Sequence, residues 1–225
     1  MKAVLFDFNG TLYNDTRFHL ASWKQYLRER FGLDLTVEEV QRRCIGPGNV
    51  DIVRDFFGPE LLLETCHQYS REKEAVYRSI CKSDPENMRL MEGAEQIFDL
   101  LAARGIPFVM ATASPIDNVE FYLNDLGLDR WFTMDRIVYE DGSVRGKPDP
   151  AFYTEAARRA GTTPDECIIV EDSKTGVEAA INAGAGRLIC IDRTVERAWL
   201  ESKKEIYALI HDFRGFEKYI DEAFC

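Results

Sequence analysis

The chain has 225 residues, of which 45% are hydrophobic and 30% are charged, so it is large enough for one domain with an inserted piece or for two small domains. Its net charge of −11 argues against nonspecific binding to nucleic acid or to an anionic membrane surface. No stretch reaches the roughly 18 apolar residues of a membrane span, and Asp7 interrupts the one apolar run near the N-terminus. We therefore expect a cytoplasmic protein whose partner is a small molecule, and no pattern indicates an oligomeric state.

A short apolar run at residues 2–8 (KAVLFDF) ends at the turn residues Asn9 and Gly10, as is typical of a buried parallel strand. From residue 15 to about residue 84 the apolar residues recur at helical spacing, and no strand pattern intervenes. We therefore predict an all-helical cap domain at residues 15–87, inserted into a core domain made of residues 1–14 and 88–225.

After the insert, strands and helices alternate, which predicts an α/β fold with an open, mainly parallel, doubly wound sheet. Ser114 and Pro115 suggest the cap and first residue of one helix. The C-terminal residues 201–225 carry no clear pattern. The expected elements are strands at 106–112, 167–170 and 186–192, and helices at 94–105, 114–127, 150–160 and 173–183.

The cysteines are scattered along the chain and form no C-x-x-C pair. This spacing fits neither a disulfide framework nor a zinc site, so we interpret them as reduced thiols. They are Cys44, Cys66, Cys81, Cys167, Cys190 and Cys225.

Chemically capable side chains fall at or just after the ends of the predicted strands. In open parallel sheets, ligands bind outside the carboxyl ends of the strands, so these side chains are expected to form one site. Each also has a simpler interpretation, as a turn residue, a surface lysine or a hydroxyl bonded to the backbone. They are Asp7, Thr112, Lys147, Glu171 and Asp172.

Three carboxylates without a neighbouring histidine or cysteine form an oxygen-rich donor set that suits Mg²⁺. Lys147 supplies a point charge for a phosphoryl group, and the hydroxyl of Thr112 can donate to a phosphate oxygen. Attack of the Asp7 carboxylate on phosphorus would give an aspartyl-phosphate. The chemistry therefore indicates phosphoryl transfer.

Four motifs in this order resemble the haloacid dehalogenase-like superfamily, in the subgroup with a helical cap after the first motif. They are DFNGT at 7–11, a strand ending MAT at 110–112, GKPDP at 146–150 and EDSKTG at 171–176. The resemblance covers most of the chain. It implies the α/β core with an inserted cap, a phosphatase-like hydrolase activity and Mg²⁺ as cofactor.

The resemblance also implies roles for single residues. Asp7 would be the nucleophile and a ligand of Mg²⁺, and Asn9 would offer its backbone carbonyl to the ion. Asp172 would be a further ligand, and Glu171 would bind the ion directly or from the surrounding layer. The phosphoryl group and the substrate would be held by Thr112, Ala113, Lys147, His19 and the backbone N–H groups around Gly10.

Asn9 departs from the family's phosphatases, where this position is an aspartate that acts as general acid and base. An amide cannot deliver a proton at neutral pH, and losing a general acid–base typically costs about 10²–10⁴ in rate. Several explanations are open. The leaving group needs no proton, as with an acyl phosphate; another acid such as His19 or Asp15 substitutes; the protein only binds a phosphate compound; or the asparagine was introduced.

The cap narrows the choice of reaction. Residues 14–24 resemble the corresponding segment of β-phosphoglucomutases, with His19 and Trp23 at matching places, although His19 could equally be a half-buried helix histidine. The arginine that those mutases use for a second phosphate is missing from the loop at 46–51, and Pro115 stands where another basic residue would be. We therefore expect a monophosphorylated substrate. A mutase, or a dehalogenase in which Asp7 attacks carbon, is the less favoured alternative.

Overall fold

The computed structural model describes residues 1–46, 48–192 and 197–224. It consists of two compact units, Met1–Asn14 with Leu90–Cys225 and Asp15–Arg89. None of the helices in the described part of the chain is long and apolar enough to cross a bilayer.

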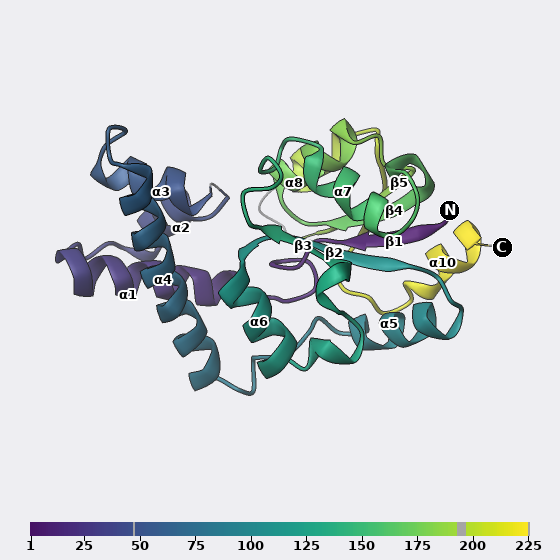
Figure 1. Ribbon diagram of the computed structural model, residues 1–225, viewed down its shortest axis with the longest axis horizontal. Helices are drawn as coiled ribbons and strands as arrows, with labels where there is room; N and C mark the ends of the chain where they lie inside the picture. The colour runs from purple at the N-terminus through teal and green to yellow at the C-terminus, as the bar shows by residue number, and fades with distance from the viewer. Residues whose placement is uncertain (47, 193–196, 225) are drawn as a thin grey trace. The chain divides into compact units, whose positions relative to one another are not determined.

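The larger unit contains a six-stranded sheet in which every neighbouring pair of strands is parallel (Figure 1). The strand order is β3-β2-β1-β4-β5-β6. This arrangement confirms the α/β fold and the open parallel sheet that the alternating elements predicted. The strands are β1 (Ala3–Phe6), β2 (Phe108–Pro115), β3 (Ile137–Glu140), β4 (Cys167–Glu171), β5 (Arg187–Ile191) and β6 (Ile206–Ile210).

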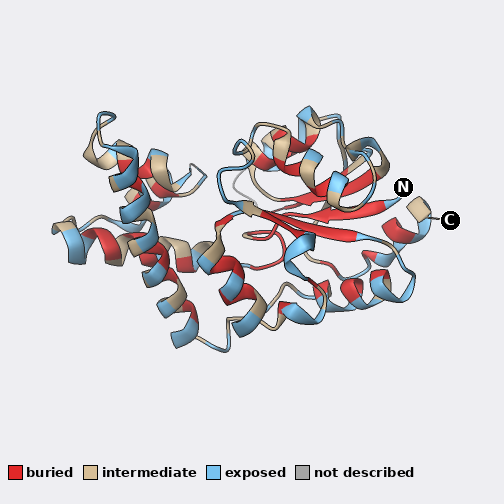
Figure 2. Ribbon diagram, in the orientation of Figure 1, coloured by how far each residue is buried: buried red, intermediate tan, exposed pale blue. Residues whose placement is uncertain are grey.

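Helices cover both faces of this sheet, with α7 and α8 on one face and α5, α6 and α10 on the other (Figure 1). Alternate residues of β1 serve the two faces: Leu5 packs in one cluster with α7 and α8, whereas the ring of Phe6 meets Phe98 of α5 at 5.6 Å. The central strands are consequently buried throughout (Figure 2), as a parallel sheet covered on both faces requires. The helices are α5 (Ala94–Ala103), α6 (Ile116–Asp125), α7 (Ala151–Arg159), α8 (Lys174–Asn182), α9 (Arg197–Glu201) and α10 (Glu217–Phe224).

Two strands and one helix start differ from the sequence-based expectations. The strands β3 and β6 were not predicted, because both are short edge strands and β6 is only half-buried, so neither shows a clear apolar period. The expected cap at Ser114 is wrong, because β2 continues to Pro115 and α6 begins at Ile116 with Pro115 as its N-cap. The hydroxyl of Ser114 instead donates a hydrogen bond to the side chain of Asn9.

The smaller unit is all-helical over its described residues, 15–46 and 48–89. A capping box explains where its second helix begins, since Thr36 and Glu39 each accept from the other's backbone N–H. An apolar cluster that includes Trp23, Leu27 and Val53 forms the core of this unit. Its helices are α1 (Thr16–Phe31), α2 (Val37–Cys44), α3 (Asn49–Phe57) and α4 (Leu63–Ser83).

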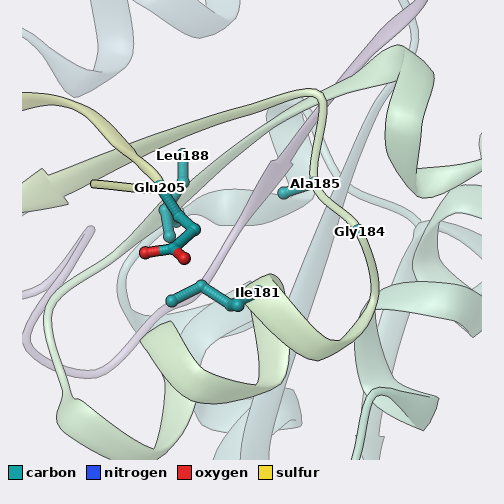
Figure 3. Close-up of a pocket in the computed structure, with 5 residues that line it drawn as sticks. All are labelled: Ile181, Gly184, Ala185, Leu188 and Glu205. Carbon is teal, nitrogen blue, oxygen red and sulfur yellow. The ribbon is translucent and has the colours of Figure 1, made fainter. Parts of the chain in front are cut away.

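A pocket of about 190 Å³ lies in the larger unit near the amino ends of β5 and β6 (Figure 3). Ile181 and Leu188 form its apolar wall, and Glu205 contributes a carboxylate. None of the residues expected to carry chemistry lines it.

The cysteines that the structure describes are all buried free thiols, as expected from their spacing. Burial raises the pKa of Cys44 to about 11 and that of Cys167 to about 12, so both are protonated at neutral pH. Cys225 lies outside the described residues.

Candidate active site

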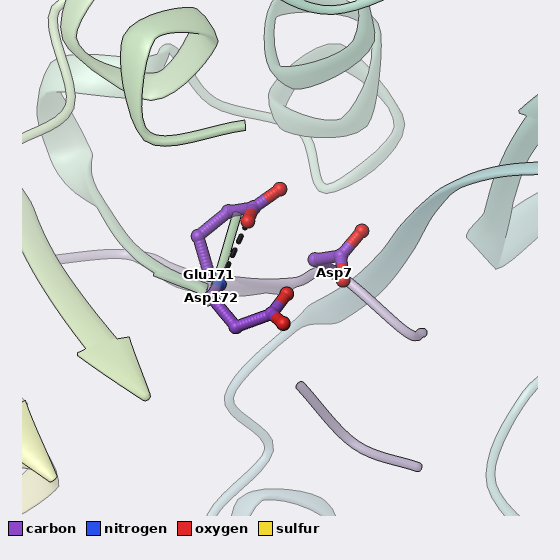
Figure 4. A group of neighbouring side chains, drawn as sticks. All are labelled: Asp7, Glu171 and Asp172. Carbon is purple, nitrogen blue, oxygen red and sulfur yellow. Dashed lines mark hydrogen bonds between the residues drawn. The ribbon is translucent and has the colours of Figure 1, made fainter. Parts of the chain in front are cut away.

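The ends of two adjacent strands bring the carboxylates together. Phe6 of β1 pairs with Val170 of β4, so the next residues along these strands are Asp7 and Glu171. The backbone N–H of Asp7 donates to the carbonyl of Val170 at 3.0 Å and continues this pairing. With Asp172, carboxylate oxygens of the three residues lie within 4.8 Å of one another (Figure 4). The cluster therefore follows directly from the strand order, and it could hold a metal ion.

Lys147 lies between two of these carboxylates. Its Nζ donates to Asp7 Oδ1 and to Glu171 Oε1, both at 2.7 Å, and to the backbone carbonyl of Ala111 at 3.2 Å. The side chain of Lys147 is 7% exposed and that of Glu171 is fully buried. One ammonium thus faces two carboxylates in a site shielded from water.

This mutual burial changes the ionisation of both partners. Burial raises the pKa of Asp7 to about 7, against the opposing attraction of Lys147 and with a further rise from Glu171. For Lys147, burial alone would lower the pKa, but the carboxylates of Asp7 and Glu171 outweigh it and raise the pKa. When all three side chains are ionised, the two carboxylates of Asp7 and Glu171 exceed the one positive charge of Lys147. This excess of negative charge favours binding of a cation.

Glu171 is saturated with hydrogen-bond donors. Its Oε1 accepts from Lys147 and, at 3.0 Å, from the hydroxyl of Tyr153, whose pKa burial raises well above the usual range. Its Oε2 accepts from the backbone N–H groups of Asp172 and Ser173 and from the hydroxyl of Ser173. A carboxylate has about four lone-pair sites, so five donors leave Glu171 little capacity to bind an ion directly. The structure thus favours Asp7 and Asp172 as the metal-binding members of the cluster.

The carboxylates of Asp172 and Glu171 each lie against a glycine, where any side chain would collide with them. A Cβ on Gly10 would lie 2.0 Å from Asp172 Oδ2, and a Cβ on Gly176 would lie 1.6 Å from Glu171 Oε1. Gly10 also has φ +84°, which other residues rarely adopt. Its N–H donates to the carbonyl of Tyr13 at 2.8 Å, so a phosphate oxygen would have to compete for this donor.

The Asn9 side chain lies in a ring of hydroxyl groups. Its Oδ1 accepts from Ser114 Oγ at 2.8 Å and from Thr112 Oγ1 at 3.1 Å, and its Nδ2 donates to Tyr122 OH at 2.9 Å. Tyr122 OH and Ser114 Oγ are 3.0 Å apart. Because Ser114 donates its single hydrogen to Asn9 Oδ1, its oxygen can accept one from Tyr122, which would close the ring.

The remaining predicted residues are spread over both units. Thr112 accepts from the N–H of Ser114 in addition to donating to Asn9, and the neighbouring Ala113 is exposed on β2. His19 lies on α1 of the smaller unit. Its ring stacks on Tyr77 and its nitrogens lie 2.8 Å from Lys73 Nζ and 3.2 Å from Asp15 Oδ2. These partners match the half-buried helix histidine, and a contact of His19 with substrate stays a prediction.

Sequence reasoning missed four side chains that complete the site. Tyr153 and Ser173 hold Glu171, while Ser114 and Tyr122 hold Asn9. The sequence carries only weak signals for these side chains. Ser173 and Ser114 each stand at the start of a predicted helix, where a serine is ordinarily interpreted as a cap.

Comparisons with known proteins show which family and which solved structures the chain resembles. The family model described as a haloacid dehalogenase-like hydrolase matches residues 1–184. A phosphorylated carbohydrates phosphatase from Thermotoga maritima is 28% identical over 198 residues and is matched over 84% of each chain. A 6-phosphogluconate phosphatase from Escherichia coli is 28% identical over 188 residues, covering 82% of this chain and 80% of that one. The crystal structure of a HAD hydrolase of family IA, variant 3, from Entamoeba histolytica superimposes with a TM-score of 0.89 at 33% identity, covering 100% of both chains.

Proposed function

The chain belongs to the haloacid dehalogenase-like hydrolases, as its four motifs predicted, and on that premise we propose that it is a phosphatase of small monophosphorylated compounds that works through Asp7. An enzyme of the phosphatase type agrees with the names of its relatives. Phosphorylated sugars and sugar acids are the first substrates to test, since those relatives are named for them.

The observation that carries this proposal is the position of Lys147 between Asp7 and Glu171, with Asp172 beside them. A carboxylate oxygen of Asp7 would attack phosphorus, and the bond to the leaving oxygen would break with its electron pair. Lys147 would stabilise the negative charge that accumulates on the transferring group. Water would then hydrolyse the aspartyl-phosphate and restore Asp7.

We include Mg²⁺ as the cofactor, because the cluster offers only oxygen donors and carries excess negative charge. Asp7, Asp172 and the backbone carbonyl of Asn9 would hold the ion, and Glu171 would hold Lys147 beside it. When bound, the ion would offset the charge of the phosphoryl group. The hydroxyl of Thr112 would turn from Asn9 to a phosphate oxygen as substrate arrives.

Asn9 determines which leaving groups we expect to react fastest at this site. Both ends of its amide are hydrogen-bonded within the larger unit, and an amide transfers no proton at neutral pH. Acyl phosphates, whose leaving carboxylate needs no proton, are therefore expected to react faster than phosphate esters of alcohols, unless a second acid such as His19 or Asp15 serves.

The test is Mg²⁺-dependent phosphate release from a panel of sugar phosphates, sugar-acid phosphates and acyl phosphates. We expect turnover by the unsubstituted protein, none by Asp7→Asn and normal turnover by Asp129→Asn, a matched control at an exposed aspartate of the same unit. Turnover retained in Asp7→Asn would overturn the nucleophile. If the unsubstituted protein binds these compounds but releases no phosphate from any of them, it is a phosphate-compound binder.

A further inference from the structure

The hydroxyl of Tyr153 lies where Lys147 and Glu171 meet. It donates its one hydrogen to Glu171 Oε1 at 3.0 Å, and its oxygen lies 3.3 Å from Lys147 Nζ. The ring of Tyr153 packs against the same ammonium, with its centroid 5.0 Å from Nζ. Tyr153 is fully buried on α7, six residues after Lys147. One side chain thus contacts both members of the pair.

The ammonium of Lys147 is shared among several oxygens. It has three hydrogens, and four oxygens lie within 3.3 Å of it: those of Asp7, Glu171, the Ala111 carbonyl and Tyr153. The division of these hydrogens depends on how strongly each oxygen attracts them. Because Tyr153 donates to Glu171 Oε1, it satisfies part of the accepting capacity of that oxygen. More of the ammonium is then available to Asp7.

We propose that Tyr153 is a positioning residue that acts through Glu171 to keep Lys147 directed at Asp7. The inference rests on the proposed function, in which Asp7 attacks and Lys147 stabilises the transferring group. Without the hydroxyl, Lys147 becomes the one donor to Glu171 Oε1 and is drawn towards it. A displaced Lys147 stabilises the transition state less well, whereas binding of the substrate elsewhere is unaffected.

The variant Tyr153→Phe removes the hydroxyl and keeps the buried ring. Tyr26→Phe is the matched control, because the Tyr26 hydroxyl also donates to a carboxylate, Glu72 Oε2 at 2.7 Å, but in the smaller unit. We expect Tyr153→Phe to lower kcat by about 10-fold to 100-fold with little change in KM, since small misplacements cost up to about 10²-fold. Tyr26→Phe should retain both constants.

A double-mutant cycle tests the route through Glu171. If Tyr153 acts through that carboxylate, Tyr153→Phe should cost little further rate in a Glu171→Gln background. An unchanged kcat in Tyr153→Phe, a rise confined to KM, or a full additional loss in the Glu171→Gln background would each overturn the proposal.

A readout that does not need turnover separates this inference from the proposed function. The ¹⁵N-labelled ammonium signal of Lys147, identified by its loss in Lys147→Met, should shift in Tyr153→Phe and stay in place in Tyr26→Phe. If the signal shifts but the unsubstituted protein releases no phosphate, the placement of Lys147 by Tyr153 stands and the phosphatase proposal fails. An unmoved signal overturns the positioning role whatever the activity.

Discussion

Asn9 donates from its Nδ2 to the hydroxyl of Tyr122 at 2.9 Å, across 113 residues of sequence. The other end of the amide accepts from Ser114 and Thr112. An amide supplies one donor group and one acceptor to this ring, whereas a carboxylate would supply acceptors alone. The surroundings of position 9 therefore satisfy both ends of an amide, whereas a carboxylate there would accept hydrogen bonds from up to three hydroxyl groups.

This relationship predicts the effect of restoring an acid at position 9. In Asn9→Asp, hydrogen bonds from Ser114, Thr112 and Tyr122 would stabilise the ionised carboxylate and oppose its use as a proton donor. We expect a gain in ester hydrolysis smaller than the about 10²–10⁴ of an effective general acid–base. Asn9→Asp with Tyr122→Phe, which removes one donor, should be faster than Asn9→Asp alone.

The measurement is kcat/KM on one phosphate ester for the two variants, with Tyr122→Phe alone as the control for loss of packing. A single variant Asn9→Asp that already reaches the full gain would show that the hydroxyl ring does not restrain the carboxylate.

Removing the ammonium of Lys147 should destabilise the larger unit. Lys147→Met leaves Asp7 and Glu171 buried without their cation, and breaking a buried ion pair in this way costs about 3–5 kcal/mol of the free energy of unfolding. Lys2→Met is the matched control, because Lys2 pairs with Glu166 at 2.8 Å but is 64% exposed, so its loss should cost about 0–1 kcal/mol. Urea unfolding in the presence of a chelator measures both, and equal costs would contradict the burial argument.

The raised pKa of Asp7 predicts how the stability of the metal-free protein depends on pH. The folded protein holds this proton with a pKa of about 7, against an ordinary value of 3.8. A carboxyl whose folded pKa is raised stabilises the fold fully below its unfolded pKa, and this contribution is lost as pH rises through the folded pKa. The free energy of unfolding contributed by Asp7 should therefore fall between these two values.

Asp7→Asn removes the titrating group and should flatten this part of the profile. The measurement is the urea midpoint with a chelator at about pH 4, 5.5 and 7.5, for both proteins. Parallel profiles would exclude Asp7 as the group responsible.

Gly176 should tolerate no side chain, although it lies inside α8. In a helix interior, alanine is ordinarily about 1 kcal/mol more favourable than glycine. Here the added Cβ would meet Glu171 Oε1 at 1.6 Å, so Glu171 would have to move and release Lys147. We expect Gly176→Ala to lose about 1–3 kcal/mol of stability, as overpacked sites do, together with activity.

Gly48→Ala is the control, since a Cβ there meets its nearest atom at 3.8 Å and the residue has an ordinary negative φ of −68°. Thermal unfolding of the two variants gives the comparison. A Gly176→Ala protein as stable as the natural one would mean that Glu171 has room to adjust.

The sequence by itself determined the sheet and the edge where the site lies. The apolar runs at 2–8 and 167–170 have the length and composition of strands buried on both faces, and helices between strands force parallel crossovers. Parallel strands present their carboxyl ends at one edge, so Asp7, Lys147, Glu171 and Asp172 could be placed together from their positions alone. The spacing of apolar residues is a local property of the sequence, and it was sufficient to locate the strands and their carboxyl ends.

Only the tertiary structure decided which partner each polar group takes. The five donors on Glu171 and the ring around Asn9 join residues on β2, β4, α6 and α7 with residues in the loops that follow β1, β3 and β4, and no periodic pattern reports such pairings. Hydrogen bonds require distances near 3 Å, which depend on strand order and on side-chain rotamers together. For this reason the sequence could suggest Ser114 as a helix cap, whereas in the folded chain its hydroxyl donates to Asn9. It could likewise place Glu171 at the metal site but could not show that Lys147 and Tyr153 donate to it.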